Sequence, residues 1–233
     1  MNDQNQFRES YRVLDLKVRN FSPSGSKALL ISSCEENTGK TSIATNFAIS
    51  LAHKNKKVLL IDGDLRKANV ASLLNDTNRK AGLINYLTDN IAYTHIINRL
   101  SIDEKNEKSL DYILAGGTVE NSSELLESEK FARLIEKLIP KYDHILIDTP
   151  PITRIIDTLI LGKVVRDLIL VIKPNHTYKE NIEMAIEELE YANMNVIGYI
   201  FNAFDLNKLS GKYKYGYGYA YGYPVSHADN VID

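Results

Sequence analysis

The sequence predicts an α/β fold in which a mainly parallel central sheet is flanked by helices and followed by a flexible, tyrosine-rich C-terminal tail. Short apolar runs recur along the chain, and most are continuous rather than alternating, which is typical of strands buried on both faces. Segments of helical periodicity separate the runs, and this alternation is the pattern of βαβ units. We therefore expect strands at 28–33, 57–64, 111–116, 143–150, 167–174 and 196–202.

The segments between these runs differ in character. Residues 41–55 and 178–193 have clear helical periodicity. Residues 88–109 are charged and poorly periodic, so we expect a surface excursion there. Beyond Asp205 the pattern stops, and a tail with few aliphatic side chains cannot bury enough surface to offset its ordering entropy.

The composition excludes several classes of protein. The 233 residues, of which 44% are apolar, suit one large domain, and the net charge of −2 lacks the basic footprint of nucleic-acid binders. No apolar run reaches the roughly 18 residues of a membrane span, and the polar start lacks the apolar middle of a signal peptide. The single cysteine, Cys34, fits a reducing cytoplasm, and the histidines show no metal-ligand spacing. We expect a soluble cytoplasmic domain.

A phosphate-binding loop is predicted where the first strand meets the first periodic helix. The stretch "CEENTGKTS" ends in the Gly-Lys-Thr of the pattern G-x-x-x-x-G-K-[ST], whose backbone N–H groups, lysine and hydroxyl hold phosphates and Mg²⁺. Chance occurrence of Gly-Lys-Thr in an ordinary strand–turn–helix is the alternative. The predicted nucleotide-binding residues of this loop are Asn37, Thr38, Gly39, Lys40, Thr41 and Ser42.

Three features of this loop are unusual for a phosphate-binding loop. Cys34 stands where the opening glycine is expected. Asn37 replaces a further glycine, and asparagine is one of the few other residues that adopts positive φ readily. Glu35 and Glu36 carry negative charge beside the predicted phosphates, so both must point outward if ATP binds.

Three aspartates are predicted to meet this loop at one edge of the sheet. Asp62, Asp64 and Asp148 follow two of the predicted strands, and ligands of open parallel sheets bind beyond the carboxyl ends of the strands. Carboxylates there supply the oxygen ligands of Mg²⁺ and a proton acceptor. Each aspartate alone could cap a turn or a helix, but the combination with the loop predicts a nucleoside-triphosphate site.

Further segments resemble the bacterial tyrosine kinases, P-loop proteins with Walker A, A′ and B motifs that partner polysaccharide co-polymerases in capsule and exopolysaccharide export. "LLIDGDLRKA" resembles their second Walker motif, and "LAGGTVENSSELLES" resembles the segment after it. "DTPPITRIID", ending in Asp157, and "GYIFNAFD", containing Asn202, resemble their later motifs. Partitioning and division-site ATPases share the first motifs but lack the tyrosine cluster, and Glu35 stands where the partitioning relatives have a signature lysine.

The resemblance implies a role for each site residue. Lys40 would hold the β- and γ-phosphates of ATP, Thr41 would bind Mg²⁺, and Asp64 and Asp148 would position the ion. Asp62 would accept the proton of the incoming tyrosine. Asn202 would lie near the adenine. The implied domains are an N-terminal oligomerisation segment at 1–24, a P-loop kinase domain at 25–206 and a tyrosine-cluster tail at 207–233.

The N-terminal segment departs from the family motif E-x-x-R-x-x-R. Glu9 and Arg12 match it, but Asp15 stands at the last arginine. An acid in place of a base would reverse a charge pair at an interface, so we expect a monomer or a loose assembly.

The tail carries the predicted phosphoacceptors of an autophosphorylation reaction between subunits. A strand with all rings on one face is the alternative, which the glycines disfavour. The implied partners are a membrane co-polymerase or adaptor whose cytoplasmic tail activates the kinase, further copies of the chain and a cognate phosphotyrosine phosphatase. The implied location is the cytoplasmic face of the plasma membrane. A catalytically weak nucleotide-bound scaffold and a partitioning-type ATPase remain alternatives. The predicted acceptors are Tyr213, Tyr215, Tyr217, Tyr219, Tyr221 and Tyr223.

Overall fold

The computed structural model describes residues 3–21, 27–77, 81–105 and 107–203. The predicted tail, with all six candidate phosphoacceptors, lies outside the described residues. Within the described ranges, no helix is both long enough and apolar enough to cross a membrane.

The predicted sheet is confirmed. Within the described part of the chain, seven strands are arranged in the order β3-β4-β2-β5-β1-β6-β7, and every neighbouring pair is parallel except β3 and β4. The five central strands are almost wholly buried, as their continuous apolar runs predict. The strands are β1 (Ala28–Ser33), β2 (Val58–Asp62), β3 (Asn98–Ser101), β4 (Ser109–Ile113), β5 (His144–Asp148), β6 (Asp167–Ile172) and β7 (Asn195–Phe201).

The surface excursion expected at 88–109 contains a strand that its sequence pattern does not show. This segment contains β3, which pairs antiparallel with β4 at the edge of the sheet. Arg99 of β3 donates two hydrogen bonds to Asp111 of β4, at 2.7 and 3.1 Å. An edge strand of four residues that is exposed at every second position has no apolar run, so its sequence resembles that of a loop.

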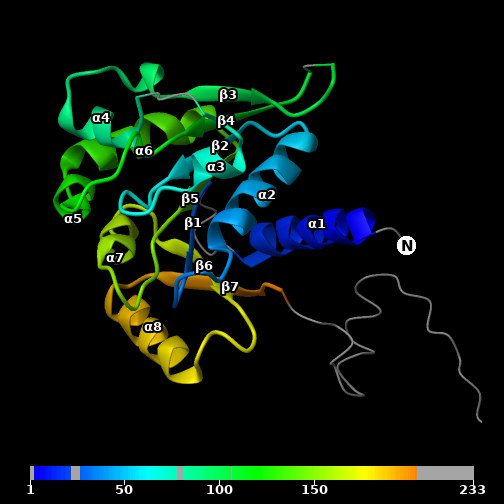
Figure 1. The fold of residues 1–233 in the computed structure, drawn as a ribbon, viewed down its shortest axis with the longest axis vertical. Coiled ribbons are helices and arrows are strands. Elements are labelled where there is room, and N and C mark those ends of the chain that lie inside the picture. Colours follow the sequence, from blue (N-terminus) through cyan, green and yellow to red (C-terminus); the bar gives the residue numbers. More distant parts are fainter. Residues whose placement is uncertain (1–2, 22–26, 78–80, 106, 204–233) are drawn as a thin grey trace, which may run out of the picture.

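Helices cover both faces of the sheet (Figure 1). α1 and α2 pack on one face, where Phe47 is fully buried, and α6, α7 and α8 pack on the other, where Phe131 is fully buried. The helices are α1 (Asp3–Phe21), α2 (Lys40–His53), α3 (Val70–Leu73), α4 (Leu83–Thr88), η1 (Tyr93–His95), α5 (Ser122–Leu126), α6 (Glu129–Leu138), η2 (Ile139–Lys141), α7 (Asp157–Gly162) and α8 (Lys179–Tyr191).

Helix α1 packs on α2 through one face that includes Asp15. Tyr11 stacks on Phe47 with ring centroids 6.4 Å apart. Asp15 is only 3% exposed, and its carboxylate pairs with Lys54 at 2.8 Å. The premise that Asp15 presents its charge to a neighbouring subunit is therefore wrong, because this acid is compensated within its own chain. The side chain of Leu16, by contrast, is 63% exposed.

Candidate active site

The loop between β1 and α2 has the backbone that the phosphate-loop pattern requires. Gly39 has a φ of 88°, and a Cβ there would lie 2.1 Å from Nδ2 of Asn202. Asn202 follows β7 and donates from Nδ2 to the carbonyl oxygen of Thr38 at 2.8 Å. The last strand is therefore joined to the loop at a position that only glycine can occupy. Asn37 has a φ of 58°, which is the positive φ expected of an asparagine that stands in place of a glycine.

The segment between β6 and α8 braces this loop. Lys173 donates to the carbonyl oxygen of Asn37 at 3.2 Å. The ring of His176 lies within hydrogen-bond distance, 2.9 Å, of the carbonyl oxygen of Glu36. These two contacts hold the backbone of the loop between Cys34, which stands at the expected opening glycine, and Gly39. Sequence reasoning missed both residues because they lie more than 130 positions from the loop.

The two glutamates of the loop point in different directions. Glu35 points away from the cavity, as predicted, and accepts from the backbone N–H of Tyr178 and the amide of Asn181 at the start of α8. Glu36 differs from the prediction because it lines the cavity. Its carboxylate pairs there with Lys67 at 2.7 Å and lies 3.6 Å from Arg154. The hydrogen bond from Lys67 lowers the pKa of Glu36.

The cavity in front of the loop measures about 310 Å³ and brings several predicted site residues together. Asn37, Gly39, Lys40, Thr41 and Ser42 line one wall. Asp64, Glu36 and Lys67 line it as well, together with Asn69, Ser72, Leu73, Pro151 and Ile155. Asp62, Asp148, Thr38 and Asn202 do not line it.

Lys40 connects the loop to the aspartates. Its ammonium lies 3.2 Å from Oδ2 of Asp64 and 3.9 Å from Oδ1 of Asp148. Burial opposes the charged form of Lys40, but Asp148 and Asp64 outweigh this effect and raise its pKa. Lys40 is therefore held as a cation at the cavity wall.

Asp62 and Asp148 lie behind this wall and are buried. The two residues are paired in register on β2 and β5, so both carboxylates reach the same sheet edge. Burial, followed by repulsion from Asp148, raises the pKa of Asp62 to about 8. Burial raises the pKa of Asp148 to about 6, and Lys40 limits that rise.

These carboxylates have oxygen atoms to spare for a cation. Oδ2 of Asp62 accepts from the backbone N–H of Val70 at 3.1 Å. Its Oδ1 is buried without a hydrogen-bond partner among the described residues, and the buried carboxylate of Asp148 has only the donors Lys40 and Thr41 close to it. The described residues contain no group of three or more His, Cys, Asp or Glu that could hold a metal by themselves. This donor set fits Mg²⁺, which binds proteins through one or two carboxylates and keeps waters and phosphates as its other ligands.

Another buried carboxylate, that of Asp157, fixes the segment after Asp64. Asp157, at the start of α7, accepts from the hydroxyls of Ser122 and Ser123 at 2.5 and 2.6 Å. Its Oδ2 also lies 3.5 Å from Nε of Arg66. The motif segments that contain Asp64, the two serines and Asp157 are thus joined at one point.

The parallel sheet, the Gly-Lys-Thr loop and the aspartates at neighbouring strand ends define a P-loop nucleotide-binding fold. The AAA domain family matches residues 27–197. A putative tyrosine-protein kinase of Staphylococcus aureus, CapB, is 34% identical over 187 residues, which are 80% of this chain and 79% of CapB.

Solved structures agree with these matches. The kinase domain of the Escherichia coli tyrosine kinase ETK has a TM-score of 0.78 and 27% identity, covering 90% of this chain and 80% of that one. The chimerical protein CapA2B2 has a TM-score of 0.77 and 26% identity, covering 84% of each chain. The chain belongs to the bacterial tyrosine kinase family.

Proposed function

We propose that this chain is an ATP- and Mg²⁺-dependent protein-tyrosine kinase that phosphorylates its own C-terminal tyrosine cluster in capsule or exopolysaccharide synthesis. The observation that carries the proposal is the cluster of Lys40, Asp64 and Asp148 beside the phosphate loop, with Asp62 behind it. Phosphoryl transfer requires positioned cations, a metal site and a proton acceptor, and this cluster supplies all of them.

The loop residues 37–42 would bind the phosphates through backbone N–H groups at the start of α2. Lys40 would move from Asp64 to the outer phosphates. Thr41, Asp64 and Asp148 would hold Mg²⁺, which neutralises the charge that develops on the transferred phosphoryl group. Asn202 would support the loop from the adenine side, since its contact with Thr38 fixes the loop backbone.

Asp62 is the proposed general base, and its environment sets a condition on that role. With a pKa of about 8 it holds a proton at neutral pH, so it must first lose that proton. A cation placed beside the unpartnered Oδ1 would favour the charged form. Asp64 lines the cavity and is the second candidate for the base.

Transfer is proposed to run between subunits. The first acceptor, Tyr213, follows Asp205 by eight residues, which span at most about 26–29 Å when extended. The distal tyrosines follow Asp205 by more residues, so the chain length allows them to reach a neighbour's site. The proposed partners are further copies of the chain, a membrane co-polymerase whose cytoplasmic tail activates the kinase, and a phosphotyrosine phosphatase. That co-polymerase would place the kinase at the cytoplasmic face of the plasma membrane.

The test mixes two variants with ATP, Mg²⁺ and the cytoplasmic tail of the membrane partner. One is Lys40→Met with an intact tail, and the other is active but has phenylalanine at the six tail tyrosines. Mass spectrometry should find phosphotyrosine on the Lys40→Met chain, at a rate that rises with concentration. Release of phosphate without phosphotyrosine would indicate an ATPase instead.

A nucleotide-bound scaffold with weak catalysis is the second candidate, and one observation favours it. Glu36 places a carboxylate in the phosphate cavity, paired with Lys67. If that acid keeps ATP from binding productively, the same assay will yield neither phosphotyrosine nor released phosphate.

A further inference from the structure

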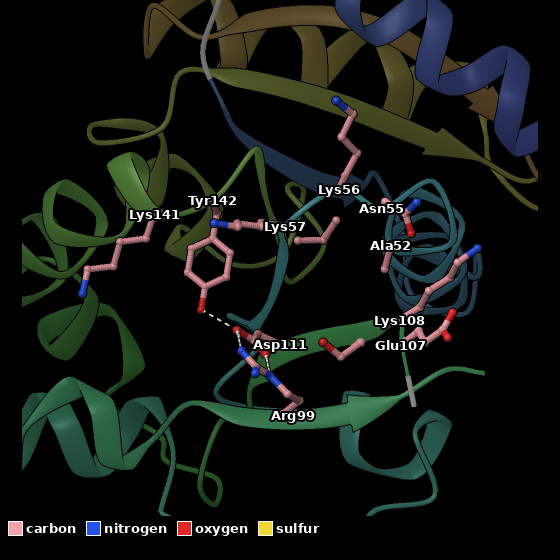
Figure 2. A pocket seen from close by; sticks show the side chains of 12 residues that line it. Ala52, Asn55, Lys56, Lys57, Arg99, Glu107, Lys108, Asp111, Lys141 and Tyr142 are labelled. Carbon is pink, nitrogen blue, oxygen red and sulfur yellow. Dashed lines mark hydrogen bonds and ion pairs between the residues drawn. The ribbon is translucent and has the colours of Figure 1, made fainter. Parts of the chain in front are cut away.

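We propose that a second cavity, at the opposite end of the sheet from the nucleotide site, binds a phosphate monoester dianion supplied by the phosphorylated tyrosines of the tail. This cavity measures about 570 Å³ and lies at the start of strands β2 and β4 (Figure 2). Val58, the first residue of β2, lines it, whereas Asp62 ends the same strand near the phosphate loop. Its assignment to the tail rests on the proposed kinase function.

The lining of this cavity is predominantly cationic. Five lysine or arginine side chains line it, against two carboxylates. The carboxylate of Asp111 is already engaged, because it accepts two hydrogen bonds from Arg99 and one from the hydroxyl of Tyr142 at 2.9 Å. Figure 2 shows the Tyr142 hydroxyl and the Arg99 guanidinium directed at this carboxylate. Asp111 therefore orients an arginine and a phenol and leaves the remaining cations without its charge.

Two of the lysines are fixed by neutral groups. Lys108 donates to the carbonyl oxygen of His53 at 2.9 Å. Lys141 donates to the hydroxyl of Tyr93, and its ammonium lies 4.8 Å from the centroid of that ring. Neither contact cancels the charge of an ammonium group. Lys57 lines the same cavity, and its backbone N–H is held by Asp143 at 2.9 Å.

A phosphate monoester on an aromatic carrier suits these groups. Such a phosphate carries a charge of about −1.5 to −2 at neutral pH and three strong acceptor oxygens, which lysine and arginine side chains bind. Tyr142 adds an aromatic wall beside the cations. Within this chain, the matching ligand is a phosphorylated tyrosine of the segment 212–224.

The tail is long enough to deliver that ligand. Strand β7 is separated from β2 by four strand spacings, which is about 19 Å, and β2 is roughly 16 Å long. Ten residues from Ala203 to Tyr213 span at most about 33–36 Å, and the later tyrosines reach further. A phosphorylated tail held at this end of the sheet would be kept away from the nucleotide site. The product of the reaction would thus be separated from the active site.

The test measures binding of a synthetic peptide, so that it does not depend on kinase activity. A fluorescent peptide of residues 212–224, phosphorylated at Tyr217, is titrated with the full chain while ADP and Mg²⁺ saturate the nucleotide site. Fluorescence anisotropy should show binding of the phosphopeptide and not of the unphosphorylated peptide. The double variant Lys57→Gln/Lys108→Gln should weaken it by at least about tenfold, since hydrogen bonds to charged groups contribute strongly.

The matched control is Lys27→Gln/Lys130→Gln. Both of these lysines donate to backbone carbonyls, as Lys108 does, and neither lines the cavity. Equal weakening by the two double variants, with both still folded by circular dichroism, would overturn the site. Inorganic phosphate and phosphotyrosine amide are then compared as competitors that displace the bound phosphopeptide. If both displace it at the same concentration, the site recognises phosphate alone, and the tail is overturned as the source of the ligand. Absence of tail phosphorylation in the mixing assay would refute the kinase proposal alone, because this peptide is made synthetically.

Discussion

At the scale of single residues, two adjacent glutamates of the phosphate loop have opposite surroundings. Glu35 binds the start of α8, whereas Glu36 lines the phosphate cavity beside Lys67 and Arg154. We expect Glu36→Gln to strengthen ATP binding, because it removes a negative charge beside the triphosphate and frees two cations. Like charges about 4 Å apart repel by at least about 1 kcal/mol, which corresponds to roughly fivefold in affinity. Isothermal titration with ATP and Mg²⁺ measures the change.

Glu35→Gln is the matched control, because it makes the same substitution one residue away from the cavity. Its ATP affinity should stay within about twofold of the unmodified chain. Weaker binding by Glu36→Gln would contradict the prediction and would show that Glu36 serves to organise Lys67 and Arg154.

The buried aspartates predict a pH dependence of stability. The folded-state pKa of Asp62, about 8, and that of Asp148, about 6, both lie above the ordinary value of 3.8. Without Mg²⁺ the folded state therefore holds more protons than the unfolded state between about pH 4 and pH 8, so stability falls as the pH rises through this window. Asp62→Asn should raise the Tm at pH 8 and leave it nearly unchanged near pH 4, as measured by thermal denaturation.

Asp143 provides a control of opposite sign. The hydrogen bond from the Lys57 backbone lowers the pKa of Asp143, so its contribution to stability is present above its unfolded pKa and is lost as the pH falls through the folded one. Asp143→Asn should lower the Tm at pH 8. An equal response of the two variants would argue against an unpaired carboxylate at Asp62.

Sequence patterns predict residue conformation better than residue contacts. The positive φ of Asn37 follows from the few residue types that adopt it. The position of Glu36 could not be predicted, because Lys67 and Arg154 come from loops 31 and 118 positions further along the chain. The approach of Asp62 and Asp148 was predictable, since parallel strands place their carboxyl ends at one edge.

At the scale of elements, Asp157 joins α5, α7 and the segment after β2. This buried carboxylate holds the hydroxyls of Ser122 and Ser123 and faces Arg66. Asp157→Ala should cost about 3–5 kcal/mol, because it leaves a partly buried arginine and two hydroxyls without their partner. Urea denaturation at fixed pH measures the loss. Ser123→Ala removes the hydrogen bond to Asp157 and the longer one from Arg66 at 3.5 Å but leaves the carboxylate in place, so it should cost about 1 kcal/mol; a similar small loss for Asp157→Ala would show that these elements are held by apolar packing.

The elements that sequence predicts and those that it misses differ in burial. β1, β2, β5 and β6 are buried on both faces and are visible as apolar runs. β3 is a short edge strand that pairs with β4, and Arg99 and Asp111 form a hydrogen-bonded cross-strand pair between the two strands. Such a pair becomes recognisable only when the register of the two strands is known. The cationic cavity has the same property, because four separate segments line it.

At the scale of the whole molecule, the position of α1 changes what can be expected of self-association. The family motif has arginine at residue 15, and Asp15 would weaken an assembly if it faced a neighbouring subunit. It instead pairs with Lys54 of its own chain and is buried between α1 and α2. Its charge thus anchors α1 to the domain, and the outward face of α1, with Leu16 exposed, is the part available to another copy.

Asp15→Arg should therefore fail to create a ring, although it restores the family motif. The substitution removes the partner of Lys54 and places a second cation beside it at a buried position. Breaking a buried ion pair in this way costs about 3–5 kcal/mol of stability. That exceeds the roughly 0.5–1.5 kcal/mol that the stacking of Tyr11 on Phe47 contributes beyond its burial. Helix α1 should therefore be held less tightly, with the packing of Leu14 and Val18 as its remaining support. Hydrogen exchange should show lost protection in α1, and light scattering should show no larger assembly. Leu16→Arg is the control, since it should retain α1 protection and weaken whatever self-association the unmodified chain has. A stable ring formed by Asp15→Arg would show that residue 15 turns outward in the assembly.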